Sequence, residues 1–228
     1  MLLVKYLFDV VFIFEWLAFL FSLFNLRKKN PKPMWIFPLV LGFIVLGEGT
    51  AFYMQKISHY NGFVYNVLMM FWLPGYMAIF YGMVESKVLK RWILSFIVIF
   101  LIFGIANFCL ADYVVWLASR IFILGGVFVT ICSVFSLWEI SNFPDQLILK
   151  NHPMFWISFS MLVYFFPVSI LMGGFEYFKH QEAVIANAYG NTFRGAQVLL
   201  NIIHYSLLSY GFVCALIFPS KVRNLKFA

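Results

Sequence analysis

Charged residues are scarce in this chain, and their scarcity argues against a water-soluble globule. Only 11% of the 228 residues are charged, whereas 64% are hydrophobic and 21% are aromatic. Such a composition leaves too little polar surface to cover a soluble protein of this size. We therefore expect a lipid bilayer to be the solvent for this chain.

Cysteine and catalytic motifs are also scarce. Cys109, Cys132 and Cys214 fall inside or at the ends of apolar stretches and show no CxxC spacing, which predicts neither a disulfide framework nor a metal cluster. No carboxylate lies three or four residues from His204. The chain has no GxSxG sequence and no phosphate-binding glycine loop. We expect no enzyme activity, no metal site and no cofactor.

Seven apolar stretches have the length of a membrane-spanning helix, which requires about 20 residues. No other segment is long enough for a soluble domain, so the sequence predicts one all-α integral membrane domain over residues 1–228. The predicted spans are 3–26, 34–54, 62–84, 91–110, 113–138, 154–177 and 196–219.

Lysine and arginine are unevenly divided between the two sides of the predicted bundle. The side richer in cations is expected to be cytoplasmic. One side carries only Lys5, Lys56, Lys179 and Arg194. We therefore predict an outside N-terminus and a cytoplasmic C-terminus. The opposite side, on the odd-numbered connections and the C-terminal tail, carries Arg27, Lys28, Lys29, Lys32, Lys87, Lys90, Arg91, Lys150, Lys221, Arg223 and Lys226.

These juxtamembrane clusters also explain the net charge of +7. They predict contact with anionic membrane lipids rather than with nucleic acid. The first apolar stretch has no small-residue cleavage pattern after it, so we expect a retained helix rather than a signal peptide. The short loops and the abundance of Phe, Ile and Lys favour a plasma membrane protein, specifically of a bacterial inner membrane.

The last three stretches share features with the first three. PheSerLeuPhe at 21–24 matches PheSerLeuTrp at 135–138, and each is followed by a polar loop and a ProMet pair, at 33–34 or 153–154. Coincidence among Phe-rich helices is the alternative explanation. A pseudo-repeat predicts a 3+1+3 arrangement, with repeat 1 at about 1–84, a linker helix at about 91–110 and repeat 2 at about 113–219.

The third and seventh stretches align on Asn66 and Asn201. In this plan the chain resembles the SWEET sugar transporters and the wider PQ-loop group, which have seven helices in a 3+1+3 order and an outside N-terminus. The resemblance implies that Asn66 and Asn201 face a substrate between the two halves. It covers the helix plan of the whole chain and few individual residues, and the chain contains no ProGln pair.

Polar residues inside the predicted spans gather in the outer half of the bilayer. An ionisable residue there costs about 2.5 to 3.5 kcal/mol to insert, so it requires a partner or a water-filled cavity. At the helical rise per residue, Glu48 and Arg120 lie roughly 10 Å from the predicted outer ends. We predict that they pair, either as part of a binding site or as a link between the halves. The predicted outward-opening pocket is lined by Glu48, Asn66, Arg120, Asn201 and His204.

Glu15 lies near the predicted midplane with no obvious cation at its depth. A carboxyl group in a low dielectric favours its neutral form, which makes Glu15 a candidate for proton coupling. The alternative is a neutral carboxyl that hydrogen-bonds between helices. His204 shares a helical face with Asn201 and is compatible with ligand binding, proton relay or donation to a neighbouring helix.

The leading functional hypothesis is a small-solute transporter in which spans 1–3 rock against spans 5–7. The second is a seven-helix sensor or receptor-like protein, whose change of conformation is recognised by a cytoplasmic partner protein. A non-catalytic partner subunit of a membrane complex is the third. The inner half offers few polar residues for a second opening, which counts against transport. The inner loops are short and cationic, which counts against a receptor.

Overall fold

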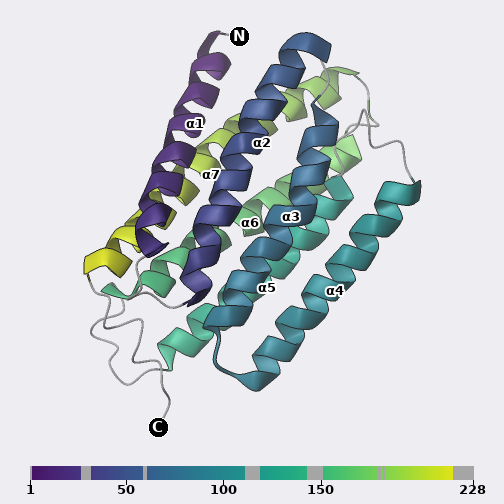
Figure 1. Ribbon diagram of the computed structural model, residues 1–228. Helices are drawn as coiled ribbons and strands as arrows, with labels where there is room; N and C mark the ends of the chain where they lie inside the picture. The colour runs from purple at the N-terminus through teal and green to yellow at the C-terminus, as the bar shows by residue number, and fades with distance from the viewer. Residues whose placement is uncertain are drawn as a thin grey trace.

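The computed structural model of the chain is a bundle of long helices (Figure 1). It describes residues 2–26, 32–58, 61–110, 119–142, 151–178, 181 and 183–217. Two short 3-10 helices, Phe24–Leu26 and Lys32–Trp35, lie between the first two α-helices. The α-helices of these described residues are α1 (Leu2–Leu23), α2 (Ile36–Ser58), α3 (Gly62–Met83), α4 (Lys87–Leu110), α5 (Ser119–Ser141), α6 (Pro153–Phe178) and α7 (Ala183–Ile217).

Within the described ranges, six helices, α2 to α7, are long and apolar enough to cross a membrane. The apolar part of α1, Val10–Leu23, is shorter. These helices confirm the predicted all-helical, multi-pass membrane architecture. The count of seven spans, the repeat and the orientation stay predictions.

The start of the last helix differs from its prediction. The sequence predicts a connection up to residue 195, whereas α7 begins at Ala183 and is 35 residues long. Tertiary contacts with the end of α6 account for the difference. The Tyr189 hydroxyl donates to the Leu171 carbonyl oxygen at 2.9 Å, and its ring lies 4.7 Å from that of Phe178. Packing, which hydropathy does not report, thus extends the helix.

Smaller differences affect two other predicted boundaries, and a third cannot be compared. The chain leaves α-helical geometry at Leu23, and residues 24–26 form a 3-10 turn instead of completing the first span. The linker helix begins at Lys87 rather than at 91. Residues 113–118 of the predicted fifth span lie outside the described residues.

Six helices form a ring in chain order, and one lies outside it. α1 packs against α2 and α7, α2 against α3, α3 against α5, and α6 against both α5 and α7. α4 packs on the outside of the ring, against α3 and α5 (Figure 1). Its exposed surface is apolar, with Trp92, Val98 and Ile102 about half exposed or more, as expected of a lipid-facing helix.

Aromatic rings fill the middle of the bundle between α3, α5 and α6. The Phe165 ring is fully buried and lies 5.6 Å from that of Trp72 and 5.9 Å from that of Tyr76. Phe122 of α5 lies 6.1 Å from Trp72. Edge-to-face and offset ring contacts at such distances stabilise a core beyond the burial of area alone.

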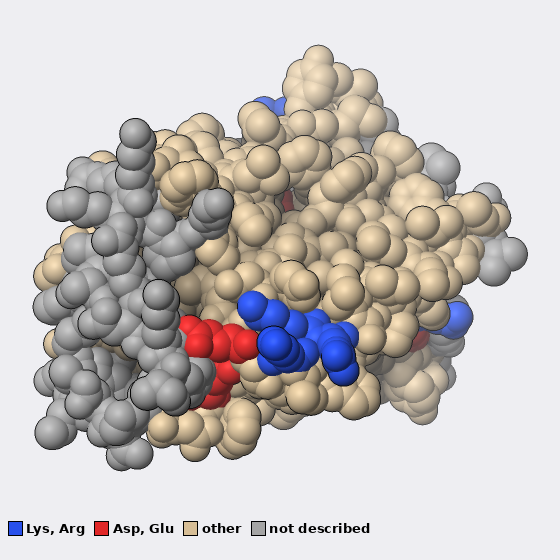
Figure 2. All heavy atoms as spheres, turned by 60° about the horizontal axis from the view of Figure 1, so that its bottom comes forward, with Lys and Arg blue, Asp and Glu red and all other residues tan. Residues whose placement is uncertain are grey.

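Glu139 near the end of α5 holds the connection between α3 and α4. Its carboxylate accepts the backbone N–H of Glu85 at 3.0 Å and that of Ser86 at 2.9 Å. These N–H groups precede the first turn of α4, so the carboxylate of α5 fixes the segment that leads into α4. Figure 2 brings this end of the bundle forward and shows acidic residues beside a group of Lys and Arg residues.

Gly125 permits the close approach of α5 to both α3 and α4. A Cβ atom at this position would lie 2.6 Å from Leu73 Cδ1 and 2.7 Å from Phe100 Cε2. Both of these side chains are fully buried, so neither has space to withdraw. The absence of a side chain at Gly125 is therefore a packing requirement.

We predict that Gly125→Ala lowers the stability of the bundle by about 1 to 3 kcal/mol, because it overpacks a closed contact. Gly173→Ala on α6 is the matched control, since no atom lies within 4 Å of its added Cβ. That control is expected to be neutral or stabilising, because Ala favours helix over Gly. Thermal unfolding of both purified variants in detergent checks the prediction, and equal effects would contradict it.

Candidate functional site

Two carboxyl groups lie inside the bundle and interact electrostatically, Glu15 of α1 and Glu48 of α2. The Glu15 side chain is 5% exposed, and Glu48 is half-buried. Tyr65 of α3 donates a hydrogen bond to Glu48 Oε2 at 2.8 Å. The Tyr205 side chain of α7 hydrogen-bonds Glu15. Each acid is therefore held by a phenol from a different helix.

Three deeply buried tyrosines, Tyr76, Tyr164 and Tyr205, surround the two acids, and each interacts electrostatically with Glu15. They come from α3, α6 and α7. With Glu15, Glu48 and Tyr65 they form a set of six that we call the acid–tyrosine cluster. It places two acidic groups and four hydroxyl groups in the interior of the bundle.

The Tyr76 hydroxyl differs from the others in the cluster. Within the part of the chain that the structure describes, it is buried without a hydrogen-bond partner. A buried hydroxyl in that condition costs about 1 to 3 kcal/mol. Tyr76 is 1% exposed, so its position next to the acids calls for a functional or structural explanation.

Tyr164 connects the cluster to the polar face of α7. Its side chain hydrogen-bonds those of Gln197 and Asn201. These residues lie one helical turn apart, so both amides present to the same side of α7. Asn201 therefore lies beside the acid–tyrosine cluster.

His204 supports the tyrosines from within α7. It is 1% exposed, and its Nδ1 donates to the Ser160 carbonyl oxygen, 3.1 Å away, because a carbonyl can only accept. Its ring stacks on Tyr164 with centroids 4.8 Å apart and lies 4.9 Å from Tyr205. Of the three predicted roles, donation to a neighbouring helix is the one that the structure shows.

Asn66 of α3 is fully buried, one residue beyond Tyr65. Its predicted role, facing a substrate in a pocket, stays a prediction.

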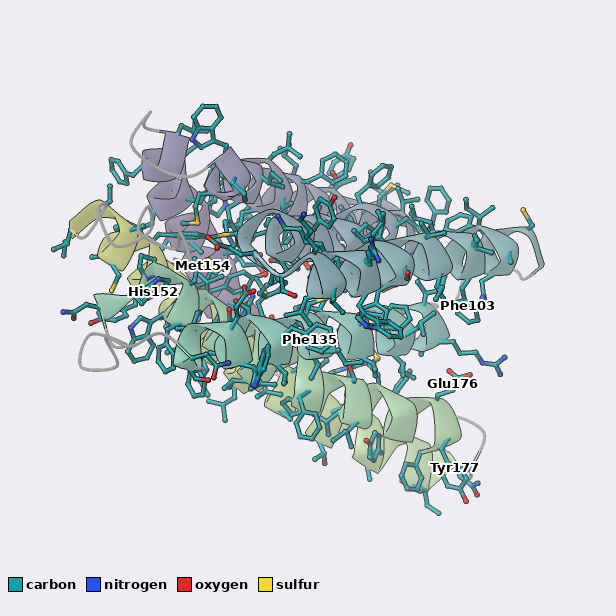
Figure 3. The ribbon with its side chains drawn as sticks, turned by 90° about the horizontal axis from the view of Figure 1, so that it is seen from below. Phe103, Phe135, His152, Met154, Glu176 and Tyr177 are labelled. Carbon is teal, nitrogen blue, oxygen red and sulfur yellow. The ribbon has the colours of Figure 1, made fainter. Side chains whose placement is uncertain are left out.

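Arg120 lies apart from the cluster, and its predicted pairing with Glu48 is wrong. Its Nε is 3.5 Å from Glu176 Oε1 of α6, and its side chain is 72% exposed. Figure 3 shows Glu176 and Tyr177 at the end of α6 opposite His152 and Met154. An exposed pair of this kind contributes about 0 to 1 kcal/mol. Equal depth does not ensure contact, because it leaves the direction of each side chain around its helix undetermined.

Two surface cavities lie away from the acid–tyrosine cluster. One, of about 370 Å³, lies where α5 meets the start of α4 and includes Glu85 and Glu139 in its lining. The other, of about 260 Å³, lies between α3 and α4 and is lined by Val67, Met70, Phe71, Ile105, Phe108 and Cys109. None of the predicted site residues lines either cavity, so the outward-opening pocket stays a prediction.

The described residues contain no group of three or more His, Cys, Asp and Glu side chains that could hold a metal ion. No family model, curated protein or solved structure matches this chain, so its site is interpreted from its own geometry.

The sequence analysis missed the tyrosines. In membrane proteins Tyr is common at the bilayer interface, where its hydroxyl contacts water. Tyr164 and Tyr205 instead lie at least eleven residues from the nearer end of α6 and α7, and Tyr76 lies seven residues from the end of α3. That depth is the signal that identifies them as partners for buried acids.

We predict that Tyr65→Phe destabilises the protein by about 1.5 to 3 kcal/mol, because it removes a hydrogen bond to a carboxyl group. Tyr177→Phe is the matched control, since the Tyr177 side chain is 65% exposed at the end of α6. It should leave the unfolding temperature unchanged. A similar loss in both variants, measured by thermal unfolding, would show that the bond to Glu48 contributes nothing specific.

Proposed function

We propose that this chain is a seven-span plasma membrane transporter for a small polar solute, with its N-terminus outside and its C-terminus in the cytoplasm. The observation that carries the proposal is the hydrogen bond between Glu15 of α1 and Tyr205 of α7. It joins the first predicted repeat to the second within the buried interior. Movement of one half against the other would break or re-form that bond, as alternating access requires.

The packing of the helices supports a division into two equivalent halves. α3 packs against α5, and α7 packs against α1. If α1, α2 and α3 correspond to α5, α6 and α7, the third helix of each half packs against the first helix of the other half, and the two contacts are equivalent. Two halves that meet at two equivalent interfaces are an arrangement in which a substrate site lies between them.

Prolines close to the cluster support movement of its helices. Pro74 lies inside α3, two residues before Tyr76, and Pro167 lies inside α6, three residues after Tyr164. A proline in a helix interior removes a backbone hydrogen bond and favours a kink. Bends at these positions would change the placement of both phenols.

The polar groups of the cluster fit a neutral or cationic solute better than an anion. Two carboxyl groups would repel an anionic ligand. The amides of Gln197 and Asn201, bonded to Tyr164, offer both donors and acceptors for hydroxyl or amine groups. We propose Glu15 as the coupling residue, whose charge state changes as the solute moves.

A receptor-like protein or a non-catalytic partner subunit is the second candidate. The burial of the cluster favours it, since Glu15, Tyr164 and His204 are each at most 5% exposed. A solute would reach them only after the helices move. In a sensor or a subunit, the same contacts would hold one arrangement of helices in place.

Uptake into proteoliposomes tests the transport proposal. Wild-type protein is expected to accumulate at least one member of a panel of labelled sugars, polyols and amino acids. Glu15→Gln should lower the rate by about tenfold or more, equivalent to about 1.4 kcal/mol of lost coupling. Glu176→Gln, which alters the exposed ion pair with Arg120, should retain the rate.

Failure of well-folded wild-type protein to take up any solute of the panel would count against transport and favour the second candidate. Equal loss of uptake in Glu15→Gln and Glu176→Gln would show that the buried acid has no special part in it.

A further inference from the structure

The two buried acids have no basic partner among the described side chains. The ion pair that these side chains form joins Arg120 to Glu176 and leaves Glu15 and Glu48 aside. Burying an uncompensated carboxylate is very costly, and burying two adjacent ones is more so. Glu15 and Glu48 interact electrostatically, and each of them hydrogen-bonds a tyrosine. The two carboxyl groups are therefore not described as a pair that shares one proton in a direct hydrogen bond.

The hydrogen bonds to these acids favour their ionised forms. Tyr65 donates to Glu48 and Tyr205 bonds Glu15, and a phenol that donates to a carboxyl group stabilises its negative charge. Burial of these acids opposes their ionisation, and the two hydrogen bonds offset only part of that cost. A bound cation would supply the remaining compensation for an ionised carboxylate.

Tyr76 supplies an independent indication of a ligand. The residue is 1% exposed, and its buried hydroxyl has no hydrogen-bond partner in the described part of the chain and lies within electrostatic range of Glu15 and Tyr164. The Tyr76 hydroxyl interacts with Glu15, which in turn interacts with Glu48, and these groups supply oxygen ligands of the kind that hard cations prefer. A bound cation would give that oxygen the partner that the protein does not provide.

The enclosure of the cluster limits the size of the ion. Glu15 and the phenols of Tyr76, Tyr164 and Tyr205 are each at most 5% exposed and Glu48 is half-buried, so the site favours a small ion over a bulky organic cation. Mg²⁺ usually keeps several of its waters, and the packed aromatic rings leave little space for them. A small ion that sheds its water readily fits the site better.

We propose that Glu15, Glu48 and Tyr76 form a binding site for one alkali metal cation, for which Na⁺ is the probe. Charge balance requires one carboxylate to pair with the ion and the other to carry a proton. The site shares residues with the proposed transport function, but ion binding is an equilibrium property and is measured without any solute.

Thermal unfolding of the purified full-length protein tests the proposal. NaCl replaces choline chloride at constant ionic strength and fixed pH, so that Tyr65, Tyr164, Tyr205 and His204 keep their protonation states. A ligand that binds the folded state raises its stability with concentration. We expect a saturable rise in the unfolding temperature with NaCl, and none in choline chloride.

Tyr76→Phe is the decisive variant because it removes only the unpartnered hydroxyl. The concentration of NaCl that gives half of the rise should increase by about tenfold, the equivalent of one lost ligand. In choline chloride the variant should be at least as stable as the wild type, since it buries no unpartnered oxygen. Glu48→Gln should abolish the response to NaCl. Tyr177→Phe and Glu176→Gln, which alter exposed groups, should respond as the wild type does.

Equal unfolding temperatures in NaCl and choline chloride would overturn the proposal, and so would an unchanged NaCl response in Tyr76→Phe. Stabilisation by CaCl₂ without stabilisation by NaCl would overturn the assignment to an alkali cation. A response to KCl equal to that to NaCl would support it. If Glu48→Gln fails to fold, Tyr76→Phe still decides the question. If the wild-type protein takes up no solute of the panel but is stabilised by NaCl, the transport proposal is rejected and the ion-site proposal is retained.

Discussion

The electrostatic interaction between Glu15 and Glu48 constrains the rest of this bundle. A carboxyl group surrounded by helices and lipid has no water to solvate it, so its neighbours must supply hydrogen bonds. Tyr65 and Tyr205 do so from α3 and α7. These bonds fix the rotation of four helices about their axes, because a helix turned by one residue would withdraw its polar group.

The remaining polar contacts of the interior follow from this constraint. Tyr164 hydrogen-bonds Asn201, and His204 stacks on Tyr164 while it donates to Ser160. The contacts extend the polar region from α1 and α2 to α6 and α7. Buried polar groups that satisfy one another in this way specify one arrangement of helices more sharply than apolar packing does. Such a region is also the part of the molecule that a ligand or an ion would perturb most.

The sequence predicts the class of the protein better than it predicts the contacts of its polar residues. Scarcity of charge and the length of the apolar stretches indicate a helical membrane protein, and the helices confirm that class. Glu15 and Glu48 interact within the bundle, and Tyr164 links Asn201 and His204 to them. Depth alone does not fix direction, and Arg120 therefore pairs with Glu176 rather than with Glu48. The tyrosines and the early start of α7 depend on tertiary contacts that hydropathy does not contain.

A double-mutant cycle on Glu15→Gln and Glu48→Gln measures the central claim, that the two buried acids act as one electrostatic unit. The free energy of unfolding of the two single variants and the double variant should depart from additivity by about 0.5 kcal/mol or more, as residues in one network do. The matched cycle of Glu15→Gln and Glu176→Gln should be additive, because Glu176 belongs to the exposed pair with Arg120. Additivity in both cycles would show that Glu15 and Glu48 are independent, and the account would fail.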